Sequence, residues 1–217
     1  MLEPLLLSFQ VSFSATLLAG VCGVALAGLL ARRRFPGAEL LDAALNAPLV
    51  LPPTVLGYYL LVLLGRNSAL GRAYEAVTGS SIVFTATGAT IAAALSALPF
   101  VARSARAALE SVESRFGEAA ATLGASPLRA FVRVSLPLAS RGILAGLTLG
   151  FARSLGDFGV TLMVAGNIPG QTQTASLAIY DAIQAGRDTQ AAALAAILTT
   201  LAVLALYAIN KLGRAKR

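Results

Sequence analysis

The sequence contains no histidine, no tryptophan and one cysteine, Cys22, and only 12% of its 217 residues are charged. A lone cysteine excludes an internal disulfide and a cysteine metal site. Without histidine, most zinc sites, Ser-His-Asp triads and histidine acid–base schemes are excluded as well. The glycine-rich phosphate-binding motifs of nucleotide-binding proteins are also absent from the sequence. We therefore expect no catalytic residue, no metal site and no bound cofactor in this chain. Any energy that its function requires must come from a partner or from a gradient.

Hydrophobic residues make up 57% of the chain, and the mean hydropathy of +0.76 is typical of a protein in lipid. A spanning helix needs roughly 20 predominantly apolar residues, and stretches of this kind lie at 9–31, 43–65, 82–102, 136–165 and 189–210. The sequence thus predicts an all-α membrane protein, one domain over 1–217, with five spans. A short or re-entrant sixth helix around 167–185 is the alternative.

The N-terminal stretch is long for a cleaved signal peptide. It carries no charge from Pro4 to Ala31, which is 28 residues, and no positive charge precedes it. We expect a retained transmembrane helix.

The cations are distributed unevenly over the predicted connections. In a five-span arrangement, 13 of the 17 lysines and arginines lie on one side. The positive-inside rule then places the N-terminus outside and the C-terminus in the cytoplasm. The cluster Arg32-Arg33-Arg34 is interpreted as a topology anchor, in preference to lipid or nucleic-acid recognition.

The second predicted span contains Pro52-Pro53. Two prolines remove two backbone donors and kink or unwind a helix, which is tolerated at membrane depth only beside protein or a water-filled cavity. The break indicates either a transport pathway or a purely architectural kink.

The longest cytoplasmic connection, 103–135, has the pattern of two short helices. Val112, Phe116, Ala120 and Leu123 form one apolar stripe. Gly124 is a natural helix stop, and Ser126-Pro127 is a natural restart. The pattern fits an amphipathic helix on the membrane surface or a docking element for a cytoplasmic protein.

Two motifs resemble a known family. Glu118-Ala119-Ala120, followed by Gly124 and then Leu136-Pro137, resembles the EAA loop of permease subunits of bacterial ABC importers. Segments 151–159 (FARSLGDFG), 165–172 (AGNIPGQT) and 178–180 (AIY) are similar to the molybdate branch of that family. One departure is Asp157, where we expect the family to have glutamate.

The resemblance implies a type I importer permease fold in the cytoplasmic membrane of a bacterium or archaeon. It further implies a homodimer, two cytoplasmic subunits that bind ATP and magnesium, and an extracytoplasmic oxyanion-binding protein. The residues that would dock on the ATPase are Glu118, Ala119, Ala120 and Gly124, with Phe116 and Leu123 as packing neighbours.

The fourth predicted span is interrupted by Arg153 and Asp157, four residues apart. Charges at membrane depth are functional candidates, but this spacing also lets the two pair and simply hold helices together. Several glycines in this region, Gly159 among them, fit a hinge. Asn167 is either a donor to an oxyanion or part of a polar turn. The pathway candidates are Pro52, Pro53, Arg153, Asp157, Gly159 and Asn167.

The leading hypothesis is a non-enzymatic permease subunit of an ATP-driven molybdate importer. Tungstate and sulfate are alternatives, because all three are tetrahedral dianions. Two other classes are an ATP-independent channel or carrier, which lacks support from inverted repeats, and a membrane scaffold that recruits another partner through 103–135.

Overall fold

The computed structural model describes residues 2–31 and 35–214, and within these ranges every regular element is a helix. The cluster Arg32-Arg33-Arg34 lies outside the described residues, as do the last two C-terminal cations, Lys216 and Arg217. Nothing structural is therefore stated for these positions.

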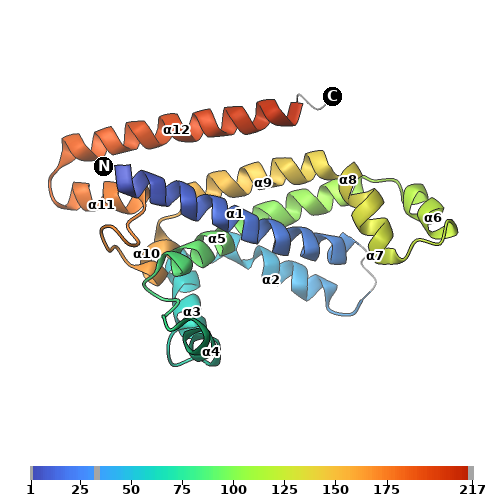
Figure 1. Cartoon of the computed structure of the whole chain (residues 1–217), viewed down its shortest axis with the longest axis horizontal. Coiled ribbons are helices and arrows are strands. Elements are labelled where there is room, and N and C mark those ends of the chain that lie inside the picture. Colours follow the sequence, from blue (N-terminus) through green and yellow to red (C-terminus); the bar gives the residue numbers. More distant parts are fainter. Residues whose placement is uncertain (1, 32–34, 215–217) are drawn as a thin grey trace.

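Four long helices run side by side along the molecule (Figure 1): α1 (Leu2–Ala31), α5 (Ala86–Glu110), α9 (Ser140–Leu155) and α12 (Asp188–Arg214). Helices α1 and α9 both pack on α5, and α12 packs on α9. The α5 helix is central because its buried side chains are small, Ala92, Ala93 and Ala97 among them. Small residues let neighbouring backbones approach closely in a membrane bundle.

A row of glycines on α9 faces α5. A Cβ built at Gly146 would lie 2.7 Å from the Ser104 Cβ, and one at Gly150 would lie 2.7 Å from the Val101 Cγ2. The i, i+4 spacing of these two glycines puts them on one helix face. Helices α5 and α9 are therefore in close contact along this row.

The structure gives three to five spans. Helices α1 and α5 and the Asp188–Ile209 part of α12 are long and apolar enough to cross a bilayer alone. Two bent pairs qualify only when each is counted as one span: α2 (Ala38–Val50) with α3 (Pro53–Leu64), bent by 119°, and Pro127–Leu138 with α9, bent by 74°. The expected five spans thus correspond to the upper end of this range.

The proline pair ends one helix and begins the next, so the predicted kink or unwinding is an unwinding at this point. Leu51, which precedes the prolines, adopts an extended conformation, as residues before proline prefer. Pro53 then occupies the first position of α3, where its missing N–H removes no hydrogen bond. The stretch 43–65 is two helices.

The stretch 136–165 is interrupted near Arg153 and Asp157, as the sequence predicted. Helix α9 ends at Leu155, and α10 (Gly159–Ala165) begins after a short interruption. Gly156 and Asp157 lie in this interruption: Gly156 N still donates to Ala152 O four residues back, whereas Asp157 N donates to Ser154 O three residues back, as in a turn. We call the interruption at 156–158 the α9–α10 break, and the one at 51–52 the α2–α3 break.

The remaining helices lie at the two ends of the bundle (Figure 1). At one end are α6 (Ser114–Thr122), α7 (Pro127–Ala130), the π-helical turn η1 (Phe131–Ser135) and α8 (Leu136–Leu138). Near the other end are α4 (Ala69–Thr78), α10 and α11 (Ala175–Gln184). Helix α11 occupies the region of the predicted sixth helix, but ten residues extend only about 15 Å, too short to cross a bilayer.

Candidate functional site

The two breaks lie against each other. A Cβ built at Gly159, the first residue of α10, would lie 2.6 Å from the Cβ of Pro53, the first residue of α3. One turn further along α3, a Cβ at Gly57 would lie 2.8 Å from the Met163 Cγ. The structure therefore brings Pro53 and Gly159, both predicted pathway residues, into direct contact.

The carboxylate of Asp157 is the polar centre of the α9–α10 break. It is 3% exposed, and its Oδ1 accepts a hydrogen bond from Ser96 Oγ at 2.9 Å and lies 3.1 Å from Arg153 Nη1. Its Oδ2 accepts bonds from Thr161 N at 3.0 Å and Thr161 Oγ1 at 2.7 Å. Four donors therefore stabilise a buried anion at the start of α10, where the helix dipole also favours it.

The pairing of Arg153 with Asp157 predicted from their spacing is confirmed. The two side chains differ in burial, however: that of Arg153 is 34% exposed and that of Asp157 only 2%. Asp157 also accepts hydrogen bonds from α5 and α10. Arg153, in contrast, has Asp157 as its one acidic partner among the described residues. Arg153 is therefore the more accessible member of the pair.

Asn167 belongs to a closed turn. Its Oδ1 accepts a bond from Gln173 Nε2 at 3.0 Å, and the buried Thr172 donates to Gly166 O and accepts from Ile168 N. Gly166 has φ +71°, a conformation suited to glycine. These bonds favour the polar-turn interpretation of Asn167 over a free oxyanion donor.

The 103–135 segment contains the predicted pair of short helices. Residues up to Glu110 still belong to α5, and Val112 precedes α6, so the amphipathic helix begins later than the apolar stripe suggested. Gly124 has φ +80°, and the Ser126 side chain caps α7 by accepting from Arg129 N. The predicted stop and restart are both confirmed.

The residues expected to dock on a partner are on the surface of this segment. Phe116 is 40% exposed and Leu123 is 88% exposed, and Glu118 and Ala119 are exposed as well, with Ala120 half-buried. Within the described residues, Glu118 forms no ion pair. An apolar surface of this kind outside the bundle is suited to a protein contact.

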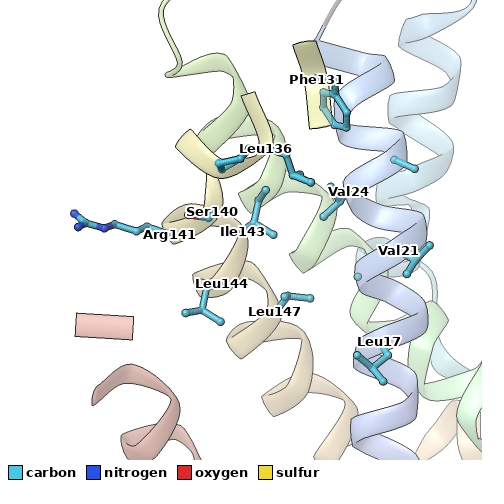
Figure 2. Close-up of a pocket in the computed structure, with 13 residues that line it drawn as sticks. Leu17, Val21, Val24, Phe131, Leu136, Ser140, Arg141, Ile143, Leu144 and Leu147 are labelled. Carbon is cyan, nitrogen blue, oxygen red and sulfur yellow. The ribbon is translucent and has the colours of Figure 1, made fainter. Parts of the chain in front are cut away.

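An open groove of about 1020 Å³ lies between α1 and the segment from η1 to α9. Leu17, Val21, Ile143 and Leu147 line it, and Figure 2 shows the Arg141 side chain extending away from these residues. Phe131 closes one end, where its ring packs against Gly28. The apolar lining makes the groove unsuitable for an oxyanion.

Comparison with known proteins agrees with this architecture. Residues 20–214 match the family described as binding-protein-dependent transport system inner membrane component. The chain belongs to this family. It is a transport component by family, as the motifs around Glu118 and Asp157 predicted.

Individual relatives extend the match to nearly the whole chain. The molybdenum transport system permease protein ModB of Escherichia coli K12 is 43% identical over 216 residues, covering 99% of this chain and 94% of ModB. The sulfate transport system permease protein CysT of Salmonella typhimurium is 38% identical, and the match covers 93% of this chain and 72% of CysT. A chain of the inward-facing MetNI methionine ABC transporter has the same fold, with a TM-score of 0.75 at 20% identity over 99% of this chain and 95% of that one.

Ser96 and the glycine row on α9 were not predicted. Ser96 is an ordinary serine in an alanine-rich helix, 61 residues from its partner Asp157, so no local pattern marks it. The row does carry a signal, because Gly142, Gly146 and Gly150 recur every fourth residue, the small-residue spacing of close helix contacts.

Proposed function

We propose that this chain is the permease subunit of an ATP-driven importer that carries molybdate across a bacterial cytoplasmic membrane. The observation that supports molybdate as the substrate is the 43% identity to ModB over 99% of the chain. The permease itself breaks no bond. ATP and magnesium bind to the partner subunits, which hydrolyse the nucleotide.

The working assembly is a homodimer of this chain, two cytoplasmic ATPase subunits and an extracytoplasmic oxyanion-binding protein, in membrane lipid and without nucleic acid. One solved structure with the same fold, at a TM-score of 0.73 and 14% identity, is a bacterial alginate ABC transporter in complex with a pentasaccharide-bound periplasmic protein. That likeness concerns fold alone. The family description, which names dependence on a binding protein, supports the extracytoplasmic partner.

The N-terminus faces outward and the C-terminus lies in the cytoplasm. In support, the C-terminal ends of α1, α5 and α12 lie at the same end of the bundle as α6 (Figure 1). Among the described residues, eight of the 12 cations belong to segments at this end, and cytoplasmic loops carry the cation excess.

The ATPase docks on the 103–135 segment through Glu118, Ala119, Ala120 and Gly124. The exposed Phe116 and Leu123 side chains fill apolar pockets of the partner, and the two alanines permit close approach. Movement of the ATPase then reaches the bundle through α7 and η1.

The substrate pathway runs beside the two breaks. Discontinuous helices are typical of transport sites at membrane depth, and Pro52, Pro53, Asp157 and Gly159 lie at such breaks. The accessible Arg153 contributes positive potential without binding the dianion tightly, since its charge is shared with Asp157. Asn167 belongs to the outer turn near this route.

Sulfate is the second candidate substrate, because CysT is 38% identical to this chain. Tungstate has the same shape and charge as molybdate. The decisive experiment reconstitutes the chain with its cognate ATPase and binding protein in proteoliposomes and measures ATPase activity with each dianion. Stimulation by molybdate above sulfate supports the proposal, and stimulation by sulfate alone contradicts it.

Co-purification separates the importer from the two other classes. We expect an ATPase subunit to remain with the detergent-solubilised chain. Oxyanion flux through the chain alone, without an ATPase, would establish a channel or carrier, and recovery of a different cytoplasmic protein would establish a scaffold.

A further inference from the structure

Three helices meet at the carboxylate of Asp157. Ser96 lies in the middle of α5, is 3% exposed, and donates to Asp157 Oδ1 at 2.9 Å. The other carboxylate oxygen receives two hydrogen bonds from Thr161 at the start of α10. One buried anion thus joins α5 to the break between α9 and α10.

A second bond connects α5 to the same region. Ser154 Oγ, on the last turn of α9, donates to Ala93 O at 3.4 Å. Ser154 and Ala93 each lie three residues before a member of the Ser96–Asp157 pair. The α9–α10 break is therefore fixed to α5 on both sides of Gly156, which argues against a freely moving hinge at this point.

The α2–α3 break is joined to the same place by packing. Pro53 lies against Gly159, and Gly57 lies against Met163, so α3 and α10 are in contact along a full turn. Sliding α10 away from α5 would also separate Asp157 from Ser96 in an apolar interior, where an unmade bond to a charged group is costly. Helices α3, α5 and α10 are thus held in one arrangement.

A different place in the chain is suited to bending. Between α7 and α9 the chain passes through the π-helical turn η1 and a 74° bend at Ala139. In this stretch Val132 and Leu138 are exposed, and π-turns interrupt the regular helical ladder. Relative motion of the α6 end and the bundle is expected here.

We propose that Ser96 is a positioning residue of the transporter: its hydroxyl holds Asp157 so that α3, α5 and α10 turn as one body when the ATPase moves α6. This inference rests on the proposed function. Without the Ser96 hydroxyl, the motion of α5 is no longer passed to α10 and α3. ATP is then hydrolysed with less substrate transported.

The test is the ratio of molybdate taken up to ATP hydrolysed in proteoliposomes holding the complete complex. We expect Ser96→Ala to lower this ratio about tenfold to a hundredfold, the range for one hydrogen bond to a charged group. The ratio is measured on intact complexes isolated by size-exclusion chromatography, so that unassembled ATPase does not contribute to it. A merely structural role of Ser96 therefore leaves the ratio unchanged.

Two further variants make the result decisive. Ser96→Thr retains the hydroxyl and is expected to keep the wild-type ratio. Thr148→Val is the matched control, because the buried Thr148 hydroxyl on α9 bonds, among the described residues, only to Leu144 O of its own helix, and we expect no change. A wild-type ratio in Ser96→Ala, or equal losses in the alanine and threonine variants, overturns the proposal.

The wild-type complex separates this inference from the function on which it rests. If the wild-type complex hydrolyses ATP but takes up no molybdate, the proposed substrate is wrong. If it takes up molybdate and Ser96→Ala matches its ratio, the substrate stands and only the role of Ser96 is wrong.

Discussion

Gly159 packs directly on Pro53, so that a Cβ at position 159 would lie 2.6 Å from the proline Cβ. Each residue begins a helix that follows a break, and the two breaks therefore lie side by side. The pair Pro52-Pro53 separates α2 from α3, and a turn between Gly156 and Gly159 separates α9 from α10. Gly159 does not adopt a positive φ, so its backbone conformation does not require glycine. The contact with Pro53 is therefore the reason for glycine at this position.

We predict that Gly159→Ala destabilises the junction of the two breaks. The added methyl group overlaps Pro53, and overpacking of this kind costs about 1–3 kcal/mol. The measurement is the thermal unfolding midpoint of the solubilised complex together with substrate uptake, and both are expected to fall.

The matched control is Gly156→Ala in the same break. A Cβ at Gly156 meets only the Ala152 carbonyl oxygen, at 3.7 Å, so we expect a midpoint close to wild type. Equal effects of the two substitutions would mean that contact with Pro53 is not the reason for glycine at position 159.

We predict that Asp157→Ala is more damaging than Arg153→Ala. The first removes the acceptor of Ser96 and Thr161 as well as the partner of Arg153, and lost hydrogen bonds to a charged group cost about 1.5–3 kcal/mol. The second leaves Asp157 with its other donors and removes a partly exposed cation, for which about 1 kcal/mol is expected. Denaturant unfolding of the purified subunit measures both.

The double variant tests how independent the two residues are. Because Asp157 has partners besides Arg153, the double variant should resemble Asp157→Ala and recover little. Recovery close to wild type would show that the two act only as a neutral pair, and equal losses in the single variants would contradict the asymmetry.

Sequence patterns predicted the local features of this fold. Continuous apolar stretches located α1, α5 and most of α12, and the spacing of Arg153 and Asp157 predicted their ion pair. The turn at Gly124 followed from the preference of glycine for positive φ. Each of these depends on residues that are close in the chain.

Features that depend on tertiary packing were not predictable in the same way. Hydropathy reports which residues prefer lipid, and it reports nothing about the direction of the chain. The prolines predicted a kinked or unwound helix, but not the 119° bend between α2 and α3. The Ser96–Asp157 bond joins residues 61 positions apart. A single sequence contains no signal for such a contact.

We predict that the contact between Phe131 and Gly28 links the 103–135 segment to α1. A Cβ at Gly28 would lie 2.8 Å from the Phe131 Cζ, so Gly28→Ala should displace the ring and lower the ATPase stimulation by substrate. Phe131→Leu in the same chain shortens the side chain and should restore part of the stimulation. If the double variant is no better than Gly28→Ala, the ring contact is not the cause.

We predict that Gly124→Arg abolishes association with the ATPase and leaves membrane insertion intact. No atom outside the neighbouring residues lies within 4 Å of a Cβ built at Gly124, so the free subunit has space for the side chain, and only the positive φ adds strain of about 1–2 kcal/mol. Bulk and charge would then enter the contact with the partner.

Gly79→Arg is the matched control, because Gly79 also has a positive φ, +71°, with nothing within 4 Å, at the C-terminal end of α4. Co-purification of the ATPase with the Gly79 variant but not with the Gly124 variant is the expected result. Retention by both would mean that Gly124 lies outside the docking surface, and loss by both would point to backbone strain.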